Sequence, residues 1–283
     1  MNTYYQVAGH IFGVSGSAEI SVLMDNYEPF RVNPPVGDPV FMLTVTEGQA
    51  VSYIEDLRQE EEGQQIICGR TAAQEPVYEF IWWNESAGWL VCTDDYREGR
   101  LILTGQHTKM AIDNAVMVMY ALSTADKATA LFHAAAVSLD GQGYMFLGKS
   151  GTGKSTHAGL WVKHIEGAVL INDDNPVVRI TDGQAVVYGS PWSGKTPCYR
   201  NVSYPLGGIV LLSQAPYNQI QRLSGLEAYV TLMSSISGQR WNEGIADGLH
   251  QTENELASTM PMWRLECLPD KAAAELCQLR IKR

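Results

Sequence analysis

The chain has 283 residues, of which 45% are hydrophobic and 18% charged, a composition typical of folded proteins that excludes disordered and fibrous classes. Its formal net charge is −11, and the acidity lies in residues 1–106, with 5 Lys/Arg against 16 Asp/Glu, whereas residues 107–283 hold 15 of each. An acidic front part argues against nucleic-acid binding there, because such affinity depends on basic groups that neutralise phosphates.

The cysteines and the N-terminus indicate the compartment. The five cysteines are odd in number and scattered, and no two form a C-x-x-C pair, so the sequence predicts neither a disulfide framework nor a zinc site. The N-terminus lacks the basic and apolar regions of a signal peptide, and no run approaches the roughly 18 apolar residues of a membrane span. We therefore expect a cytoplasmic protein that does not attach to a membrane.

Residues 1–106 are predicted to form a β-rich acidic domain. Short apolar stretches alternate with turn clusters over residues 4–54, and residues 77–104 predict three strands of an antiparallel meander. Residues 55–65 are charged, contain a glycine and lack an apolar stripe, so we expect a loop there. The tryptophans of this domain are typical of a sheet core or its edge, and we assign them no function. They are Trp82, Trp83 and Trp89.

From residue 107 the pattern changes to that of a helix, with apolar side chains on one face over 107–125, and we place the start of a second domain, 107–283, at this change. Residues 225–259 and 271–281 also predict helices, the last with Asp270 as its N-cap. The alternation of helices with short apolar runs predicts an α/β fold with a mixed sheet. The expected strands are 132–139, 144–147, 169–174, 177–180, 185–188, 206–212 and 262–267.

The second domain is organised around residues 144–156, in which a short apolar strand runs into a glycine-rich turn and then a helix. The pattern G-x-x-x-x-G-K-[ST] extends from Gly148 to Ser155; its backbone N–H groups surround phosphate oxygens, its lysine reaches the β/γ-phosphates and its hydroxyl binds Mg²⁺. The start of the helix adds its free amides and its dipole to this anion site. The residues expected to bind a nucleotide are Gly148, Ser150, Gly151, Thr152, Gly153, Lys154, Ser155 and Thr156.

Other residues of this domain are candidate partners of the phosphate loop. Asp173 and Asp174 end an apolar strand, where α/β sheets present functional residues, and two adjacent acids can divide the tasks of holding Mg²⁺ and accepting a proton. The alternative interpretation is an ordinary turn after a strand. Lys195 could neutralise charge on a transferred phosphoryl group, bind an anionic substrate or lie in a solvated surface turn. His133 begins an apolar strand, where a lone histidine is more often a core residue than a catalytic one.

Three segments together resemble a known family: His133-Ala-Ala-Ala-Val, the phosphate loop, and Leu170-Ile-Asn-Asp-Asp. They are similar to the catalytic domain of HPr kinase/phosphorylase and its paralogues, within the phosphoenolpyruvate carboxykinase-like fold. Thr156 stands where true HPr kinases generally carry glutamate, and their later signature segment is not found. The Pro-Trp-Ser-Gly-Lys195 loop instead looks like the paralogous HPr-kinase-related proteins, so we predict a paralogue of HPr kinase.

The resemblance implies roles for single residues. His133 would be the active-site histidine, and Lys154 and Ser155 the pair that binds phosphate and Mg²⁺. Asp173 would be the base toward the acceptor hydroxyl, with Asp174 beside the metal. The implied fold is a phosphoenolpyruvate carboxykinase-like P-loop kinase domain after a β-rich N-terminal domain.

We therefore expect a Mg²⁺- and ATP-dependent kinase that phosphorylates a hydroxyl of a small molecule or protein, with GTP and pyrophosphate as alternative donors. The expected catalytic residues are Asp173, His133 and Lys195, and the expected metal ligands are Ser155 and Asp174. A nucleotide-binding sensor without phosphoryl transfer is the main alternative, and an enzyme of the phosphoenolpyruvate carboxykinase type is a further one. Related kinases often assemble into oligomers, which makes a homo-oligomer one option.

Overall fold

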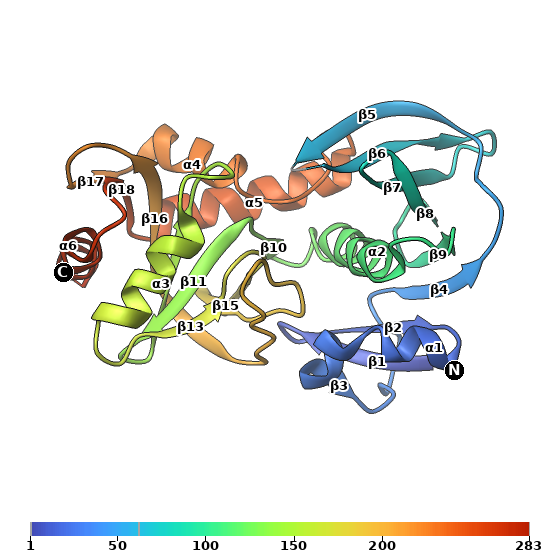
Figure 1. The fold of residues 1–283 in the computed structure, drawn as a ribbon, viewed down its shortest axis with the longest axis horizontal. Coiled ribbons are helices and arrows are strands. Elements are labelled where there is room, and N and C mark those ends of the chain that lie inside the picture. Colours follow the sequence, from blue (N-terminus) through green and yellow to red (C-terminus); the bar gives the residue numbers. More distant parts are fainter. Residues whose placement is uncertain (1, 62, 283) are drawn as a thin grey trace. The chain divides into compact units, whose positions relative to one another are not determined.

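The computed structural model describes residues 2–61 and 63–282 and separates the chain into two units, Met1–Thr124 and Ala125–Arg283 (Figure 1). The boundary expected from sequence, after residue 106, precedes helix α2 (Thr108–Ser123), and this helix belongs to the N-terminal unit. Within that unit the Tyr120 hydroxyl donates a hydrogen bond to the Val7 carbonyl over 3.1 Å, and Met119 packs against Cys92. The helix therefore completes the core of the first unit.

The N-terminal unit contains a mixed sheet with the strand order β3-β1-β2-β4-β9-β8-β7-β6-β5. The meander predicted over residues 77–104 is confirmed, because β7, β8 and β9 pair in antiparallel fashion. The β2–β4 and β4–β9 pairs are parallel. The strands are β1 (Asn2–Val7), β2 (His10–Ser15), β3 (Arg31–Val32), β4 (Met42–Glu47), β5 (Tyr53–Glu61), β6 (Gln64–Thr71), β7 (Pro76–Trp82), β8 (Glu85–Cys92) and β9 (Glu98–Leu103). Helix α1 (Ala18–Val22) and a 3-10 helix (Asp25–Phe30) lie between β2 and β3.

The loop predicted over residues 55–65 is wrong. The segment contains most of β5 and the start of β6, which pair with each other in antiparallel fashion. β5 is an edge strand whose residues after Tyr53 are exposed, so neither of its faces needs apolar side chains. Charged side chains on such an edge also discourage pairing with a further chain. A strand of this kind has no apolar alternation by which the sequence could reveal it.

The three tryptophans of this unit differ in burial. Trp89 is 7% exposed and packs with Val77 and Val91, which confirms the expected core position. Trp82 is half-buried at the end of β7. Trp83 is 68% exposed and has φ +44° in the turn that joins β7 to β8.

The C-terminal unit contains the second mixed sheet, with the order β10-β14-β15-β16-β12-β11-β13 and with β18 paired to β16 and β17 to β18. The pairs β12–β16 and β16–β18 are parallel, and the other pairs are antiparallel. The strands are β10 (Thr129–Leu131), β11 (Ala134–Leu139), β12 (Gln142–Leu147), β13 (Val169–Asn172), β14 (Val177–Thr181), β15 (Gln184–Tyr188), β16 (Ser203–Gln214), β17 (Gln219–Leu223) and β18 (Met262–Cys267).

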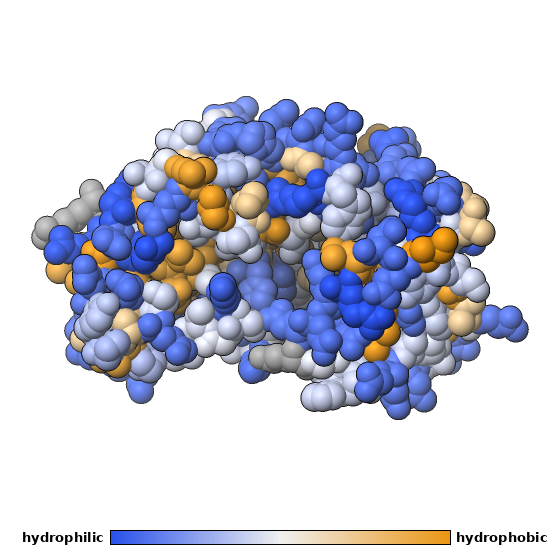
Figure 2. Space-filling model, turned by 90° about the horizontal axis from the view of Figure 1, so that it is seen from above, coloured by the Kyte–Doolittle hydropathy of each residue, from blue (hydrophilic) through white to orange (hydrophobic). Residues whose placement is uncertain are grey.

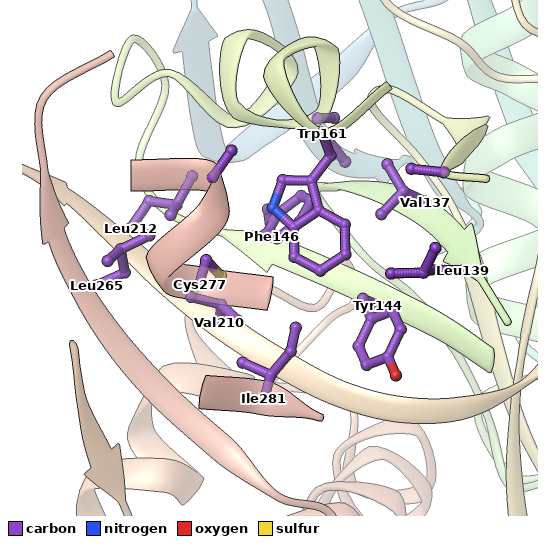
Figure 3. Close-up of a cluster of buried hydrophobic side chains, with 14 of the residues drawn as sticks. Val137, Leu139, Tyr144, Phe146, Trp161, Val210, Leu212, Leu265, Cys277 and Ile281 are labelled. Carbon is purple, nitrogen blue, oxygen red and sulfur yellow. The ribbon is translucent and has the colours of Figure 1, made fainter. Parts of the chain in front are cut away.

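Helices α3 (Lys154–His164) and α6 (Lys271–Ile281) pack on this sheet over the core drawn in Figure 3. Trp161 of α3 is fully buried, and its ring centroid lies 5.4 Å from that of Phe146 and 5.6 Å from that of Tyr144, both on β12. The predicted N-cap of α6 is confirmed, because the Asp270 carboxylate accepts a hydrogen bond from the Ala273 amide over 2.8 Å. The core thus fixes the strand and the helix on either side of the glycine-rich turn.

The helical segment predicted over residues 225–259 consists of α4 (Gly225–Met233) and α5 (Glu243–Thr259). α4 exposes Leu226, Val230 and Met233 along one face.

In the view of Figure 2, apolar patches are scattered over a mainly hydrophilic surface. Among the described residues, no helix has both the length and the apolarity that crossing a membrane requires.

Candidate functional site

The glycine-rich turn lies between β12 and α3, as the sequence predicts. Gly148, Gly151 and Gly153 have φ angles of +151°, +76° and +102°, a backbone region that favours glycine. A Cβ added to Gly148 would lie 2.5 Å from the Thr152 hydroxyl oxygen and 3.1 Å from the Leu212 carbonyl oxygen. The tight turn therefore requires glycine at its first position.

The Lys154 side chain folds back over this turn. Lys154 is 7% exposed, and its ammonium donates hydrogen bonds to the Gly148 carbonyl over 3.0 Å and to the Lys149 carbonyl over 3.4 Å. The Thr152 hydroxyl donates to the same Lys149 carbonyl over 2.7 Å, and the Gln214 amide at the end of β16 donates to the Gly151 carbonyl over 3.0 Å. Hydrogen bonds from α3, from β16 and within the turn thus hold the turn in this conformation, with Ser150 exposed at its tip.

Ser155, the second residue of α3, connects the turn to the end of β13. Its hydroxyl donates a hydrogen bond to the Asp173 carbonyl over 3.2 Å. Since a hydroxyl has one hydrogen and two lone pairs, this bond leaves the oxygen lone pairs able to bind a cation. The next residue, Thr156, is exposed on the first turn of α3.

Asn172, the last residue of β13, was not among the residues predicted from sequence, yet it organises the acidic turn. It is fully buried; its amide oxygen accepts from the backbone N–H groups of Asp174 and Asn175, over 2.9 and 2.8 Å. Its amide nitrogen donates to the Trp192 carbonyl over 3.0 Å and to the Ser190 hydroxyl over 3.1 Å. Its place directly before two aspartates was the one available signal, because the partners in 190–192 are distant in sequence.

The Asp173 carboxylate lies inside the loop that carries Lys195. Asp173 is 3% exposed, and its Oδ1 accepts from the Ser193 hydroxyl over 2.6 Å and from the Gly194 amide over 2.8 Å. Its Oδ2 accepts from the Thr196 amide over 2.8 Å. These donors occupy both carboxylate oxygens in this conformation, whereas the Lys195 side chain is exposed between two of the donors.

Asp174 is more accessible and faces His133. The His133 Nε2 and the Asp174 Oδ1 lie 3.7 Å apart, with 37% and 35% of the respective side chains exposed. The side-chain amide of Asn175 donates a hydrogen bond to the other carboxylate oxygen of Asp174, Oδ2, over 2.7 Å. The Asp174 carbonyl accepts from the Ala134 amide over 2.8 Å, which holds the two segments side by side.

The strand predicted from residue 132 is wrong at its start, because β11 begins at Ala134 and His133 lies in the bend before it. The backbone there turns to meet another segment: the His133 amide donates to the Ser235 carbonyl over 2.8 Å, and the Ser237 amide donates to the Leu131 carbonyl over 2.9 Å. His133 is therefore half-exposed at the end of the sheet rather than within its core.

A second histidine of this region, His157, is buried on α3 one turn after Lys154. Its Nε2 accepts the indole N–H of Trp161 over 3.2 Å, and its ring lies edge-on to Phe146 with centroids 4.7 Å apart. Burial lowers its pKa from 6.5 to about 4. The hydrogen bond from Trp161 is made to an unprotonated Nε2, so the neutral ring packs between α3 and β12, the elements that flank the glycine-rich turn.

The residues present suit a phosphate-bound Mg²⁺ better than a protein-only metal centre. Among residues 2–61 and 63–282, no group of three or more His, Cys, Asp or Glu side chains is arranged to hold a metal ion. Mg²⁺ is commonly bound by one or two carboxylates together with substrate phosphates and water. The Ser155 hydroxyl and the Asp174 carboxylate are candidate oxygen ligands for such an ion.

Comparisons with known proteins give a match to one family and matches to solved structures. No curated protein matches the chain. The solved structure of the Hpr(Ser) kinase/phosphatase from Coxiella burnetii matches with a TM-score of 0.33 and 11% sequence identity, over 54% of this chain and 88% of that one. The family model described as SynChlorMet cassette protein ScmC matches residues 103–267, which is more than half of the sequence and includes the whole of the site above. The chain therefore belongs to the ScmC family.

Proposed function

We propose that the C-terminal unit is a P-loop phosphotransferase that binds Mg-ATP and transfers a phosphoryl group to a hydroxyl of a small molecule or protein. The observation that carries this proposal is the hydrogen bond from the Ser155 hydroxyl to the Asp173 carbonyl, over 3.2 Å. It joins the glycine-rich turn to the acidic end of β13 and leaves the hydroxyl lone pairs able to bind a cation. This contact supports the proposal because it brings the turn that would bind the phosphates next to the side chains that would act as acid and base.

The proposed work of the turn is to bind and orient the nucleotide. The N–H groups of the turn and of the α3 N-terminus would surround phosphate oxygens, and the Lys154 ammonium would exchange its carbonyl partners for them. Ser155 and Asp174 would hold the Mg²⁺, which, when bound, neutralises the charge that develops on the phosphoryl group. Lys195 would add a second cation to the same group.

Deprotonation of the acceptor is a separate task. The sequence predicts Asp173 as the base, but its two carboxylate oxygens accept hydrogen bonds from Ser193, Gly194 and Thr196. We therefore assign proton acceptance to His133, with the Asp174 carboxylate 3.7 Å away to stabilise the imidazolium that forms. Both side chains are accessible to an acceptor from solvent.

The proposal is tested first by nucleotide binding. Titration calorimetry of the full chain with Mg-ATP should detect binding, and Lys154→Ala should weaken it by about 10- to 100-fold, because hydrogen bonds to charged groups contribute about 1.5–3 kcal/mol. Lys163→Ala, which removes an exposed lysine from the same helix, is the matched control and should bind as the wild type does. A wild-type chain that binds no Mg-ATP would refute the proposal.

Transfer is tested with ATP labelled at the γ-phosphate, incubated with metabolite and protein pools and analysed by mass spectrometry. A labelled phosphoester product that disappears with His133→Ala supports the kinase. Binding without any phosphorylated product would favour a nucleotide sensor, and phosphoenolpyruvate formed from oxaloacetate would favour a carboxykinase.

A further inference from the structure

The loop that carries Lys195 is wrapped around a buried carboxylate. Three donors from residues 193–196 converge on Asp173: the Ser193 hydroxyl, the Gly194 amide and the Thr196 amide, over 2.6, 2.8 and 2.8 Å. Two of them are backbone N–H groups that flank Lys195 directly in the chain. The Asp173 carboxylate therefore fixes the backbone on both sides of Lys195, while the lysine side chain stays exposed.

The close approach of loop and acid explains the glycine before the lysine. A Cβ added to Gly194 would lie 3.1 Å from the Asp174 Cβ and 3.5 Å from both carboxylate oxygens of Asp173. A side chain at this position would crowd the acidic turn and lengthen the hydrogen bond from the Gly194 amide. Asn172 secures the preceding part of the loop through the Trp192 carbonyl, over 3.0 Å.

We infer that Asp173 is a positioning residue that acts through Lys195. Its carboxylate holds the lysine loop, and its carbonyl accepts the Ser155 hydroxyl, so one residue sets the loop that displays the lysine relative to the glycine-rich turn. The buried carboxylate accepts three hydrogen bonds from this loop, in keeping with the rule that buried polar groups are hydrogen-bonded. This role rests on the proposed function: the Lys195 ammonium contacts the γ-phosphate of the bound nucleotide, and Asp173 takes no part in proton transfer.

The holding of the loop is tested without any substrate. Asparagine at position 173 offers one acceptor oxygen and one NH₂ group, so Asp173→Asn cannot accept from both the Gly194 and the Thr196 amide. Hydrogen exchange of at least one of these two amides, measured by NMR, should become about 10- to 100-fold faster, as expected for the loss of a charge-assisted hydrogen bond. Asp182→Asn, in the exposed turn between β14 and β15, is the matched control and should leave both rates unchanged.

Unchanged exchange at Gly194 and Thr196 in Asp173→Asn would overturn the inference, whatever the chain binds. If that variant does not fold, Ser193→Ala removes a single donor to the same carboxylate and should still accelerate exchange at the Gly194 amide. Equal rates in the wild type and Ser193→Ala would then count against the clamp.

The action through Lys195 is tested by a double-variant cycle on γ-phosphate recognition. Asp173→Asn and Lys195→Ala should each lower the preference for Mg-ATP over Mg-ADP by the same factor, about tenfold for one charged contact. The double variant should be no worse than Lys195→Ala alone, because residues that act as a unit are not additive. Independent, multiplying losses in binding preference or in ATP turnover would overturn the inference and return Asp173 to a separate catalytic role.

The two proposals fail in different ways. A wild type that binds no Mg-ATP refutes the proposed function and the assignment of Lys195 to a phosphate, while accelerated loop exchange in Asp173→Asn would still support the clamp. A wild type that binds Mg-ATP, combined with unchanged loop exchange in Asp173→Asn, refutes the positioning role alone.

Discussion

The buried His157, on the helix that follows the glycine-rich turn, should make the C-terminal unit less stable in mild acid. His157 is 3% exposed, accepts the Trp161 indole N–H and contacts Phe146 of β12. Protonation would place an uncompensated charge against the rings of Phe146 and Trp161, which belong to the core of Figure 3, and would break the bond from Trp161. We predict that this one group accounts for a measurable loss of stability below neutral pH.

The sign and size follow from the two pKa values of His157. Burial lowers the pKa from 6.5 in the unfolded chain to about 4 in the fold, so the unfolded state binds more protons between these values and stability falls as pH decreases. The contribution is fully present above the unfolded pKa. Between about pH 7.5 and about pH 5 the expected loss is about 2 kcal/mol, and it approaches about 3 kcal/mol near the folded pKa.

Urea unfolding followed by tryptophan fluorescence at these two pH values measures the effect. His157→Gln retains an oxygen that can accept the Trp161 indole N–H but cannot titrate, so this variant should lose about 2 kcal/mol less than the wild type on acidification. His164→Gln, which removes a less buried histidine from the end of the same helix, is the matched control. Equal losses in the wild type and in His157→Gln would refute the reasoning.

Further predictions concern the support of the site. Trp161→Ala should lower the free energy of unfolding of the C-terminal unit by about 3–5 kcal/mol, measured by urea denaturation, because it empties the centre of a packed core. Gly148→Ala should weaken Mg-ATP binding and lower the melting temperature more than Gly151→Ala, because an added Cβ meets the Thr152 hydroxyl at 2.5 Å in the first case and nothing within 4 Å in the second. Asp270→Ala should cost about 1 kcal/mol of stability through the loss of the α6 N-cap, and Asp270→Asn should restore most of it.

Local patterns predicted the elements that face an apolar core. The strand before the glycine-rich turn is a continuous apolar run that is buried on both faces, whereas the strand pair around 181–184 and the helices α2 and α6 bury residues at about the period of their secondary structure. The structure confirms all of these elements. β5 was missed because it lies at a sheet edge with exposed residues and carries no such period. The boundary between the two units was placed before α2 for a related reason. The sequence shows that α2 has an apolar face, but it does not show which of the two sheets that face covers.

Within the site, the sequence predicted which residues approach one another better than what each of them contacts. The glycine-rich turn and the acidic turn after β13 do meet, through the hydrogen bond between Ser155 and Asp173. The clamp between Asp173 and residues 193–196 joins positions at least 20 residues apart, and its donors are mostly backbone amides, which every residue possesses. No residue type marks such a contact, so the roles of Asp173 and Asp174 were separated in the sequence only by the family resemblance and not by the residues themselves.

The burial of the side chains distinguishes Asp173 from Asp174. Along the turn after β13, Asn172 is fully buried, Asp173 is 3% exposed, and the Asp174 side chain is 35% exposed. A buried amide or carboxylate must have its hydrogen bonds satisfied within the protein, and the first two residues meet this requirement by holding the lysine loop. An acid that supports a loop in this way cannot exchange its donors for a substrate hydroxyl without releasing the loop, whereas Asp174 can meet both His133 and a ligand from solvent. The acidic turn therefore divides into a buried part that fixes geometry and an accessible part that is able to do chemistry.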